Sequence, residues 1–524
     1  MSLDSSDYST SISIGSYSGL FQGSEKFGTS LKYAADGKNF SVLGGVLKSM
    51  TDGSVKVPAK LDAPIGTLML LHRRFTIATL EDYPTLFVAA AGNRLYVRGV
   101  KDDSTADGDN IVGGWRIIDE SIQNDVFDYV TYEISTYYTK DGIRVAPGTE
   151  GATEVTCDNP IDIMVMTNAT DGMIIIYGDD LSVVRYTVQP DPEKPEKKFG
   201  VLTRHAERIW GGAIPDQPDM LMYSATYDPL DWAQRSGEAL ADGAGDIQQP
   251  SWDGDSFVAL RVYGSYLLAI KRNRIWRVSG TNPSEYYFKE QYGGGALYEN
   301  TCVVYSDYMF MLGYNCLMVY DGTAVSEFRK EFVKDVLARV NWDAAGCATA
   351  TMRGTVYCLA LPLDGSTINN AILEYDVSEK TFTLRDGVYV SSFLPYEDKL
   401  YYTDSRDNDT LPSGRVMVLD DTGNVLPMRY VTAWQDLGYR NVVKSGFEVY
   451  LCCDHDVEVK VGMRTEKKLK ERTVSLTANK TKTVRLNAQG RQFRLELEIP
   501  TPDVKVTSWA LLGNIQISME LDWD

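Results

Sequence analysis

Histidine is scarce in this 524-residue sequence, which contains only His72, His205 and His455. These residues lie in different predicted segments and no two have the spacing of metal ligands, so we expect no histidine-based metal centre. The sequence also lacks a Gly-x-Ser-x-Gly elbow, a cysteine paired with histidine at a helix start and a Walker-type Gly-Lys-Ser/Thr loop. These absences argue against nucleophilic hydrolysis and against work driven by ATP.

Long apolar runs and a disulfide framework are absent as well. No apolar run is long enough to span a bilayer, and the first ten residues have neither the basic nor the apolar region of a signal peptide. The seven cysteines are an odd number without regular spacing. We therefore expect reduced thiols, and a chain synthesised in a reducing cytoplasm.

Positive charge is in deficit except in one segment. The sequence has 52 Lys and Arg against 72 Asp and Glu, a net charge of -20, which argues against tight wrapping of nucleic acid. Residues 460–491 reverse this balance with ten Lys or Arg against two Glu, so the rest of the chain has 42 against 70, a net charge of -28.

The basic segment is the candidate binding site of this sequence. A charge run is most often a solvated hairpin; the functional alternative is a tip that contacts an acidic neighbour or DNA phosphates. The candidate residues are Lys460, Arg464, Lys467, Lys468, Lys470, Arg472, Lys480, Lys482 and Arg485.

Short apolar segments closed by turn residues predict an all-β fold. The 44 Gly suit tight turns, and the 32 Tyr suit half-buried strand faces. A unit of strand, turn and strand recurs every few tens of residues, as at 85–97 and 171–186, and this recurrence is typical of an irregular β-propeller with five to seven units. The clearest helical spacing of apolar residues is at 327–341.

Changes in the pattern divide the chain into three parts. Residues 1–60 form an arm without a compact pattern of its own, and residues 61–427 form the propeller, with insertions at about 101–170 and 188–200. Residues 428–524 alternate between apolar and polar positions, which predicts a C-terminal β-sandwich module. We expect the N-terminal arm to pair with this module.

An acidic turn could bind a metal ion. Asp404, Asp407 and Asp409 could provide carboxylate oxygens for Ca²⁺, but their spacing differs from that of an EF-hand loop. A solvated acidic turn is the preferred interpretation. We therefore predict neither a metal nor a cofactor.

Two further groups have simple structural explanations. Cys452, Cys453 and His455 form a small cluster, which is better explained by a strand that turns to the surface. Trp210 and Trp232, with the tyrosines between them, could form a platform for a sugar, but such residues more often pack between sheets. We favour the core interpretation.

The segment 208–280 carries a resemblance to a known family. It reads Arg208-Ile209-Trp210-Gly211-Gly212, then Tyr223 to Trp232, and ends with Asn273-Arg274-Ile275-Trp276-Arg277-Val278-Ser279-Gly280. The order of these pieces resembles the β-propeller core of tail-nozzle proteins (tail-hub, or packaged-DNA-stabilising, proteins) of short-tailed bacteriophages. The resemblance is best over 200–325, weaker over 20–50 and 66–100, and hardly extends to the C-terminal module.

The resemblance implies a structural role in the virion tail. Proteins of this family form a ring, usually six-fold, below the portal and adaptor. The ring continues the DNA channel, retains packaged DNA and presents side surfaces to tail fibres, and it needs no catalytic residue, membrane or sequence-specific DNA contact. Such a chain would be made in the host cytoplasm.

Two other functions stay open at this stage. One is a distal tail or adhesin propeller that binds a host glycan. The other is a carbohydrate-active propeller enzyme, which would need carboxylates and several arginines converging at the central channel. The repeated Ser-x-Asp-x-Gly-x-Thr-Trp turns usual in propeller sialidases are absent from this sequence.

Overall fold

A computed structural model provides the structure of this chain. The residues that it describes are 8–14, 17–22, 33–58, 61–73, 85–101, 111–134, 137–138, 144–145, 155–156, 161–190, 193, 195–234, 242–248, 254–406, 413–420, 422–500, 510–511 and 515–522.

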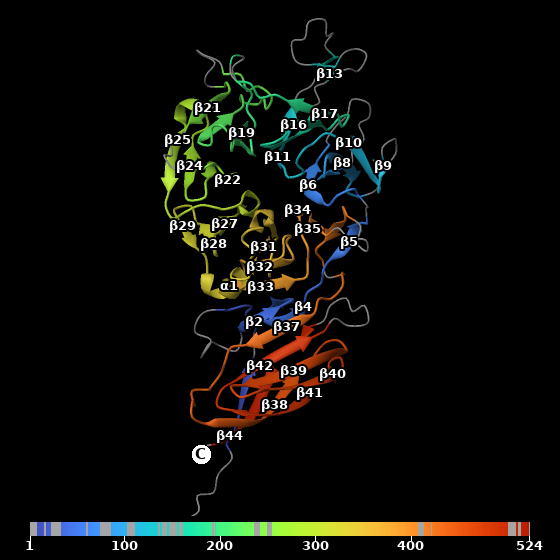
Figure 1. Ribbon diagram of the computed structural model, residues 1–524, viewed down its shortest axis with the longest axis vertical. Coiled ribbons are helices and arrows are strands. Elements are labelled where there is room, and N and C mark those ends of the chain that lie inside the picture. The colour runs from blue at the N-terminus through green and yellow to red at the C-terminus, as the bar shows by residue number, and fades with distance from the viewer. Residues whose placement is uncertain are drawn as a thin grey trace, which may run out of the picture.

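Seven antiparallel sheets follow one another along the chain and form a β-propeller, which confirms the predicted fold class (Figure 1). The first strand of each blade contacts the first strand of the next blade, from β11 (Asp128–Ile134) round to β34 (Ser392–Tyr396). Strand β34 then contacts β6 (Ile65–Leu71), the first strand of blade 1. These strands therefore surround the centre, and the ring is closed. Blades 1 to 4 are β6 (Ile65–Leu71), β7 (Leu86–Ala91), β8 (Arg94–Gly99), β10 (Trp115–Asp119) and β9 (Ile111–Val112); β11 (Asp128–Ile134), β15 (Ile161–Asn168), β16 (Gly172–Tyr177) and β17 (Val183–Tyr186); β18 (Val201–His205), β19 (Arg208–Gly212), β20 (Met220–Tyr223) and β21 (Gly245–Gln248); and β22 (Ala259–Tyr263), β23 (Tyr266–Ile270), β24 (Ile275–Ser279) and β25 (Tyr287–Gln291).

Blades 5 to 7 complete the ring. They are β26 (Val303–Tyr305), β27 (Tyr308–Gly313), β28 (Cys316–Tyr320) and β29 (Val325–Glu327); β30 (Thr349–Arg353), β31 (Val356–Leu361), β32 (Ala371–Asp376) and β33 (Thr381–Asp386); and β34 (Ser392–Tyr396), β35 (Lys399–Thr403), β36 (Val416–Val418) and β5 (Ser54–Val57). Short 3-10 helices η2 (Pro283–Glu285), η3 (Glu299–Thr301) and η4 (Ala345–Cys347) lie in the connections. The helix expected at 327–341 is present as α1 (Lys330–Leu337).

Middle strands of the blades are largely apolar because neighbouring blades cover both of their faces. Every residue of β7 is buried, as is every residue of β15 and β28. A strand that is buried on both faces reads as a continuous apolar run and not as an alternating pattern. This burial explains why the propeller segments look different in sequence from the C-terminal module.

Blade 7 is closed by the N-terminal arm. The fourth strand of this blade, β5, pairs antiparallel with β36, and Val57 is buried in the cluster shared with blade 1. The sequence boundary at residue 60 assigned this strand to the arm, so the predicted boundary is wrong by one strand. The error arises because the pairing joins residues more than 350 positions apart, which no local pattern records.

The predicted insertion at about 101–170 is only partly correct. Strands β10, β11 and β15 lie within it and are regular parts of blades 1 and 2. The polar residues Asp162 and Asn168 interrupt the apolar pattern of β15, although both are buried. Three short strands form a separate small sheet between β11 and β15: β12 (Tyr137–Tyr138), β13 (Arg144–Val145) and β14 (Val155–Thr156).

A β-sandwich lies below the propeller (Figure 1). One sheet has the order β1 (Tyr8–Ile14), β44 (Ile515–Asp522), β38 (Val443–Leu451) and β41 (Lys482–Gly490). The other has the order β2 (Ala34–Lys38), β37 (Met428–Thr432), β42 (Phe493–Ile499), β39 (Val457–Thr465) and β40 (Leu469–Leu476). The N-terminal strands β1 and β2 therefore pair with C-terminal strands in both sheets.

One hydrophobic cluster joins the sandwich to blades 5 and 6. It includes Phe310 and Leu359 of the propeller and Phe447 and Leu495 of the sandwich. A small sheet of β3 (Phe40–Leu43), β4 (Val46–Ser49) and β43 (Ala510–Leu511) lies between them, and β3 contacts β33. A continuous apolar core without an open linker makes the propeller and the sandwich one packed unit.

Candidate functional site

The basic segment 460–491 occupies two different sheets of the sandwich. Strands β39 and β40 pair as a hairpin at the end of one sheet, whereas β41 is the end strand of the other sheet. The two end strands β40 and β41 contact each other. The segment is therefore not the single hairpin expected from the sequence; it forms one rim of the sandwich, built from the edges of both sheets.

Three of the nine predicted cations are neutralised within the chain. The Lys460 ammonium lies 2.9 Å from a Glu471 carboxylate oxygen and 3.6 Å from one of Glu498. Arg464 donates to Glu496. These contacts use the charges of Lys460 and Arg464 to hold neighbouring strands together, so neither is available to a partner.

Arg485 is the third of these cations. Its guanidinium donates to Glu448 at 2.6 Å, and Glu448 also accepts a hydrogen bond from Tyr450 at 2.8 Å. The hydrogen bonds from Tyr450 and Arg485 lower the pKa of the Glu448 carboxyl. Because β38 carries Glu448 and β41 carries Arg485, this pair holds the two strands in register.

The other six cations form an exposed group, which we call the cationic rim. All six are exposed, and none makes an ion pair with another residue in the part of the chain that the structure describes. The cationic rim consists of Lys467, Lys468, Lys470, Arg472, Lys480 and Lys482.

Strand β40 leaves its charged side chains exposed although its neighbour is buried. Lys470 lies opposite Met463 of β39, and Arg472 lies opposite Val461. Opposite residues of an antiparallel pair share a face, and Met463 and Val461 are both buried. Lys470 and Arg472 are nevertheless exposed, so the other sheet does not cover their side chains.

A groove of about 610 Å³ opens beside this edge. Its single carboxylate, Glu466, accepts hydrogen bonds from the backbone N–H groups of Arg491 at 2.8 Å and Gln492 at 3.1 Å. The groove is thus lined by cations, and its one carboxylate is already bound by backbone N–H groups. Its lining residues are Arg440, Val443, Glu466, Lys467, Gly490, Arg491 and Gln492.

A buried lysine shapes the wall of this groove. The Lys444 ammonium, which is fully buried, donates to the backbone carbonyls of Tyr439 at 2.5 Å, Val442 at 3.1 Å and Arg491 at 2.7 Å. Burial lowers the pKa of Lys444. Lys444 and Arg440 lie outside the basic segment, and no sequence pattern indicates that they border it.

A second group of charged residues lies next to the innermost strands of the propeller. Asp128 begins β11 of blade 2, Arg261 lies in β22 of blade 4, and Glu299 begins η3 in the connection between blades 4 and 5. Burial, followed by the nearby Asp128 carboxylate, raises the pKa of Glu299 well above its ordinary value, and the two carboxyl groups are in hydrogen-bonding contact. Arg261 donates to the backbone carbonyls of Cys302 at 3.0 Å and Glu299 at 3.2 Å.

A cavity of about 470 Å³ adjoins this group. Glu299 forms part of its lining, together with Asp255, Arg272 and Tyr298. Sequence reasoning missed Asp128, Arg261 and Glu299 because each stands alone in its own segment. Only closure of the ring brings them together.

The acidic turn is not arranged as a calcium site at its described end. The Asp404 carboxylate is buried and binds two guanidinium groups, those of Arg406 and Arg415. These cations already compensate its charge. Asp407 and Asp409 lie outside the described residues.

The cluster around Cys453 and His455 centres on a single carboxylate, that of Asp454. His455 lies 2.9 Å from Asp454, and the Cys453 thiol is buried beside the same carboxylate. Burial raises the pKa of the Cys453 thiol to about 11, so it is protonated at neutral pH. Among the described residues, no group of three or more His, Cys, Asp or Glu could hold a metal ion.

The two tryptophans considered for a sugar platform, Trp210 and Trp232, belong to the core, as expected. Trp210 is fully buried and packs against Tyr223 with ring centroids 5.0 Å apart. Trp232 packs in the same way against Phe199, also at 5.0 Å. Tyr227, which lies between them in the sequence, is 73% exposed. The buried tryptophan rings are therefore not available to a sugar.

Comparisons with known proteins show no family for this chain. No family model matches the chain, and no curated protein matches it. Among solved structures, it is similar to the WD40 domain of Pan2 from Neurospora crassa, with 8% identity, a TM-score of 0.30, and coverage of 69% of this chain and 97% of that one. It is also similar to an exo-β-1,3-galactanase from Phanerochaete chrysosporium, with 8% identity, a TM-score of 0.24, and coverage of 75% and 100%. At such TM-scores these similarities carry no argument about function.

Proposed function

We propose that this chain is a structural subunit of an oligomeric ring in a virion, of the tail-nozzle or tail-hub type found in short-tailed bacteriophages. The ring, six-fold in the resembling proteins, would continue the DNA channel below the portal and adaptor, retain packaged DNA and dock tail fibres. The observation that carries the proposal is the cationic rim on an otherwise acidic, rigid unit. A subunit that assembles through fixed surfaces needs such rigidity and complementary charge.

The acidic balance of the chain suits a protein that DNA must pass without adhering. Outside residues 460–491 the net charge is -28, and a surface of this sign repels phosphate. DNA could then move along the ring without sequence-specific contacts. The described part of the chain contains no helix long and apolar enough to cross a membrane.

The carboxyl pair beside the propeller centre gives little support to a carbohydrate-active enzyme. Glycosidases hold their two carboxyl groups about 5–9.5 Å apart, with the sugar and water between them. Asp128 and Glu299 are in hydrogen-bonding contact, and the Arg261 guanidinium is occupied by backbone carbonyls. This arrangement suits a structural contact between blades.

Electron microscopy tests the proposal directly. Purified full-length protein, or virions labelled with an antibody against it, should show a symmetric ring on the tail axis. A chain that stays monomeric at all concentrations and has no place in the virion would refute the proposal. Binding of the purified chain to a glycan array would favour the adhesin, and release of products from host polysaccharide would favour the enzyme.

A further inference from the structure

The cationic rim makes no ion pair with any residue that the structure describes. Its six cations lie on the end strand of each sheet and on the adjoining turns, and their side chains are exposed. The acidic residues Glu466 and Glu471 of the same segment are already bound, since Glu466 accepts from two backbone N–H groups and Glu471 pairs with Lys460. The rim is therefore a positive surface that is open to an external anion.

Blade 3 has the opposite character. Its described residues from 213 to 234 and from 242 to 248 include six aspartates and no lysine or arginine. Four of these aspartates are exposed and make no ion pair within the described residues: Asp216, Asp228, Asp242 and Asp246. Next to Asp228, the side chain of Tyr227 is 73% exposed. Tyrosine is enriched at protein interfaces, so an exposed tyrosine beside these aspartates favours a contact with another protein surface.

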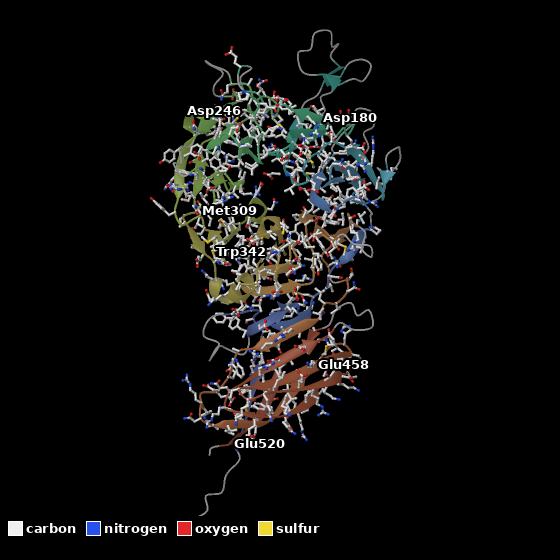
Figure 2. All side chains as sticks on the ribbon, viewed as in Figure 1. Asp180, Asp246, Met309, Trp342, Glu458 and Glu520 are labelled. Carbon is white, nitrogen blue, oxygen red and sulfur yellow. The ribbon has the colours of Figure 1, made fainter. Side chains whose placement is uncertain are left out.

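We propose that the cationic rim of one copy binds the exposed aspartates of blade 3 of a second copy. This inference rests on the proposed function, because it supplies the contact that assembles the subunits. Asp246 lies at the end of the propeller that is far from the sandwich (Figure 2). Two different surfaces of the chain therefore meet, and such a heterologous contact produces a closed ring when the rotation between copies closes.

A second copy explains the rim better than DNA does. A DNA duplex that approaches the rim is also repelled by the rest of the chain, whose net charge is -28. A neighbouring copy presents carboxylates at fixed positions on a rigid blade and has no continuous phosphate backbone. Charge complementarity of this kind sets the partner and the orientation of association.

Sedimentation velocity of the full-length chain tests the proposal through charge reversal. The variant K470E/R472E should associate about tenfold more weakly than wild type, or not at all, since like charges then face each other. The variant D242K/D246K should show the same loss. An equimolar mixture of the two variants should associate again, because the reversed charges are complementary.

Matched controls separate this effect from a general change of charge. Lys289 and Lys399 are exposed lysines of the propeller, and K289E/K399E changes the net charge by the same amount as K470E/R472E. We expect K289E/K399E to associate like wild type. All variants should keep the melting temperature of wild type within a few degrees, which would exclude unfolding as the cause of any loss.

The outcomes distinguish this inference from the proposed function. If K470E/R472E still forms the wild-type ring, or if the mixed variants fail to associate, this inference is wrong and the ring function stands. If wild type forms no ring, the proposed function fails. Fluorescence anisotropy with a DNA duplex completes the test: binding that K470E/R472E abolishes, with association unchanged, would identify DNA as the partner instead.

Discussion

The carboxyl group of Glu299 lies in hydrogen-bonding contact with the carboxyl group of Asp128, although Asp128 belongs to blade 2 and Glu299 to the connection between blades 4 and 5. Asp128 also accepts hydrogen bonds from the backbone N–H groups of Tyr129 at 3.1 Å and Leu202 at 2.8 Å. Two carboxyl groups in such contact share a proton, and the raised pKa of Glu299 places it there. This proton bridges blade 2 and the connection that follows blade 4.

The first prediction concerns the pH dependence of stability. The pKa of Glu299 is raised in the folded chain, so the folded state binds the proton more tightly than the unfolded state does. Its contribution to stability is complete below the unfolded pKa of about 4.3 and is lost as pH rises through the folded pKa. Gln keeps a donor and cannot ionise, so E299Q should lose less stability than wild type between pH 5 and pH 8.

Urea unfolding of both proteins at the two pH values measures this difference. E133Q serves as a control, because Glu133 lies on the same strand as Asp128 and the substitution makes the same chemical change. Equal losses of stability in wild type and E299Q would contradict the bridging role of the proton.

The second prediction concerns a buried ion pair that joins blade 6 to the N-terminal arm. Arg385 donates to Glu374 at 2.7 Å and to the backbone carbonyl of Thr51 at 2.6 Å, and both charged residues are buried. Arg353 also lies 3.2 Å from Glu374, so R385M leaves Glu374 one partner, whereas E374Q leaves Arg385 without a counter-charge. E374Q should therefore lower the free energy of unfolding by about 3–5 kcal/mol, and R385M by less.

The double variant E374M/R385M should be less destabilised than the sum of the two single variants, because it leaves no buried charge unpaired. Denaturant unfolding of all four proteins completes this cycle. Additive losses would show that the two side chains do not interact.

The third prediction concerns closure of the propeller by β5. Val57 is 1% exposed in the cluster between blades 7 and 1, whereas Val55 on the same strand is 49% exposed. A carboxylate at position 57 would be buried without a partner, so V57D should destabilise the chain by at least about 2 kcal/mol. Limited proteolysis should then cut V57D near residues 54–57 faster than wild type. V55D is the matched control, and equal cleavage of both variants would contradict the burial argument.

The fourth prediction concerns the groove in the sandwich. Met fits the space of Lys444 but cannot donate to the three carbonyls that Lys444 binds, so K444M should lower the free energy of unfolding by about 1–3 kcal/mol. K468M removes an exposed ammonium and should change stability by less than about 0.5 kcal/mol. Thermal unfolding compares the two; a stability of K444M equal to that of wild type would mean that water replaces the ammonium.

The exposed and buried parts of the candidate site differ in how far the sequence predicts them. Lys470 and Arg472 could be chosen from sequence, because a local excess of charge is visible in a short window. Arg485 could not be separated from them, since its partner Glu448 lies 37 residues away on a strand that pairs with its own. For the same reason, the contact between Asp128 and Glu299 could not be predicted from the sequence.

The sequence by itself determined the all-β propeller, the C-terminal sandwich and the position of the positive charge. Apolar periodicity, turn residues and local charge are properties of short segments, so they can be read without knowing the fold. Tertiary structure decided that β5 closes blade 7, that the basic segment divides between two sheets, and that six of its nine predicted cations stay without an internal ion pair among the described residues. Each of these outcomes depends on contacts between residues far apart in the chain, and those contacts exist only after the ring and the sandwich have closed.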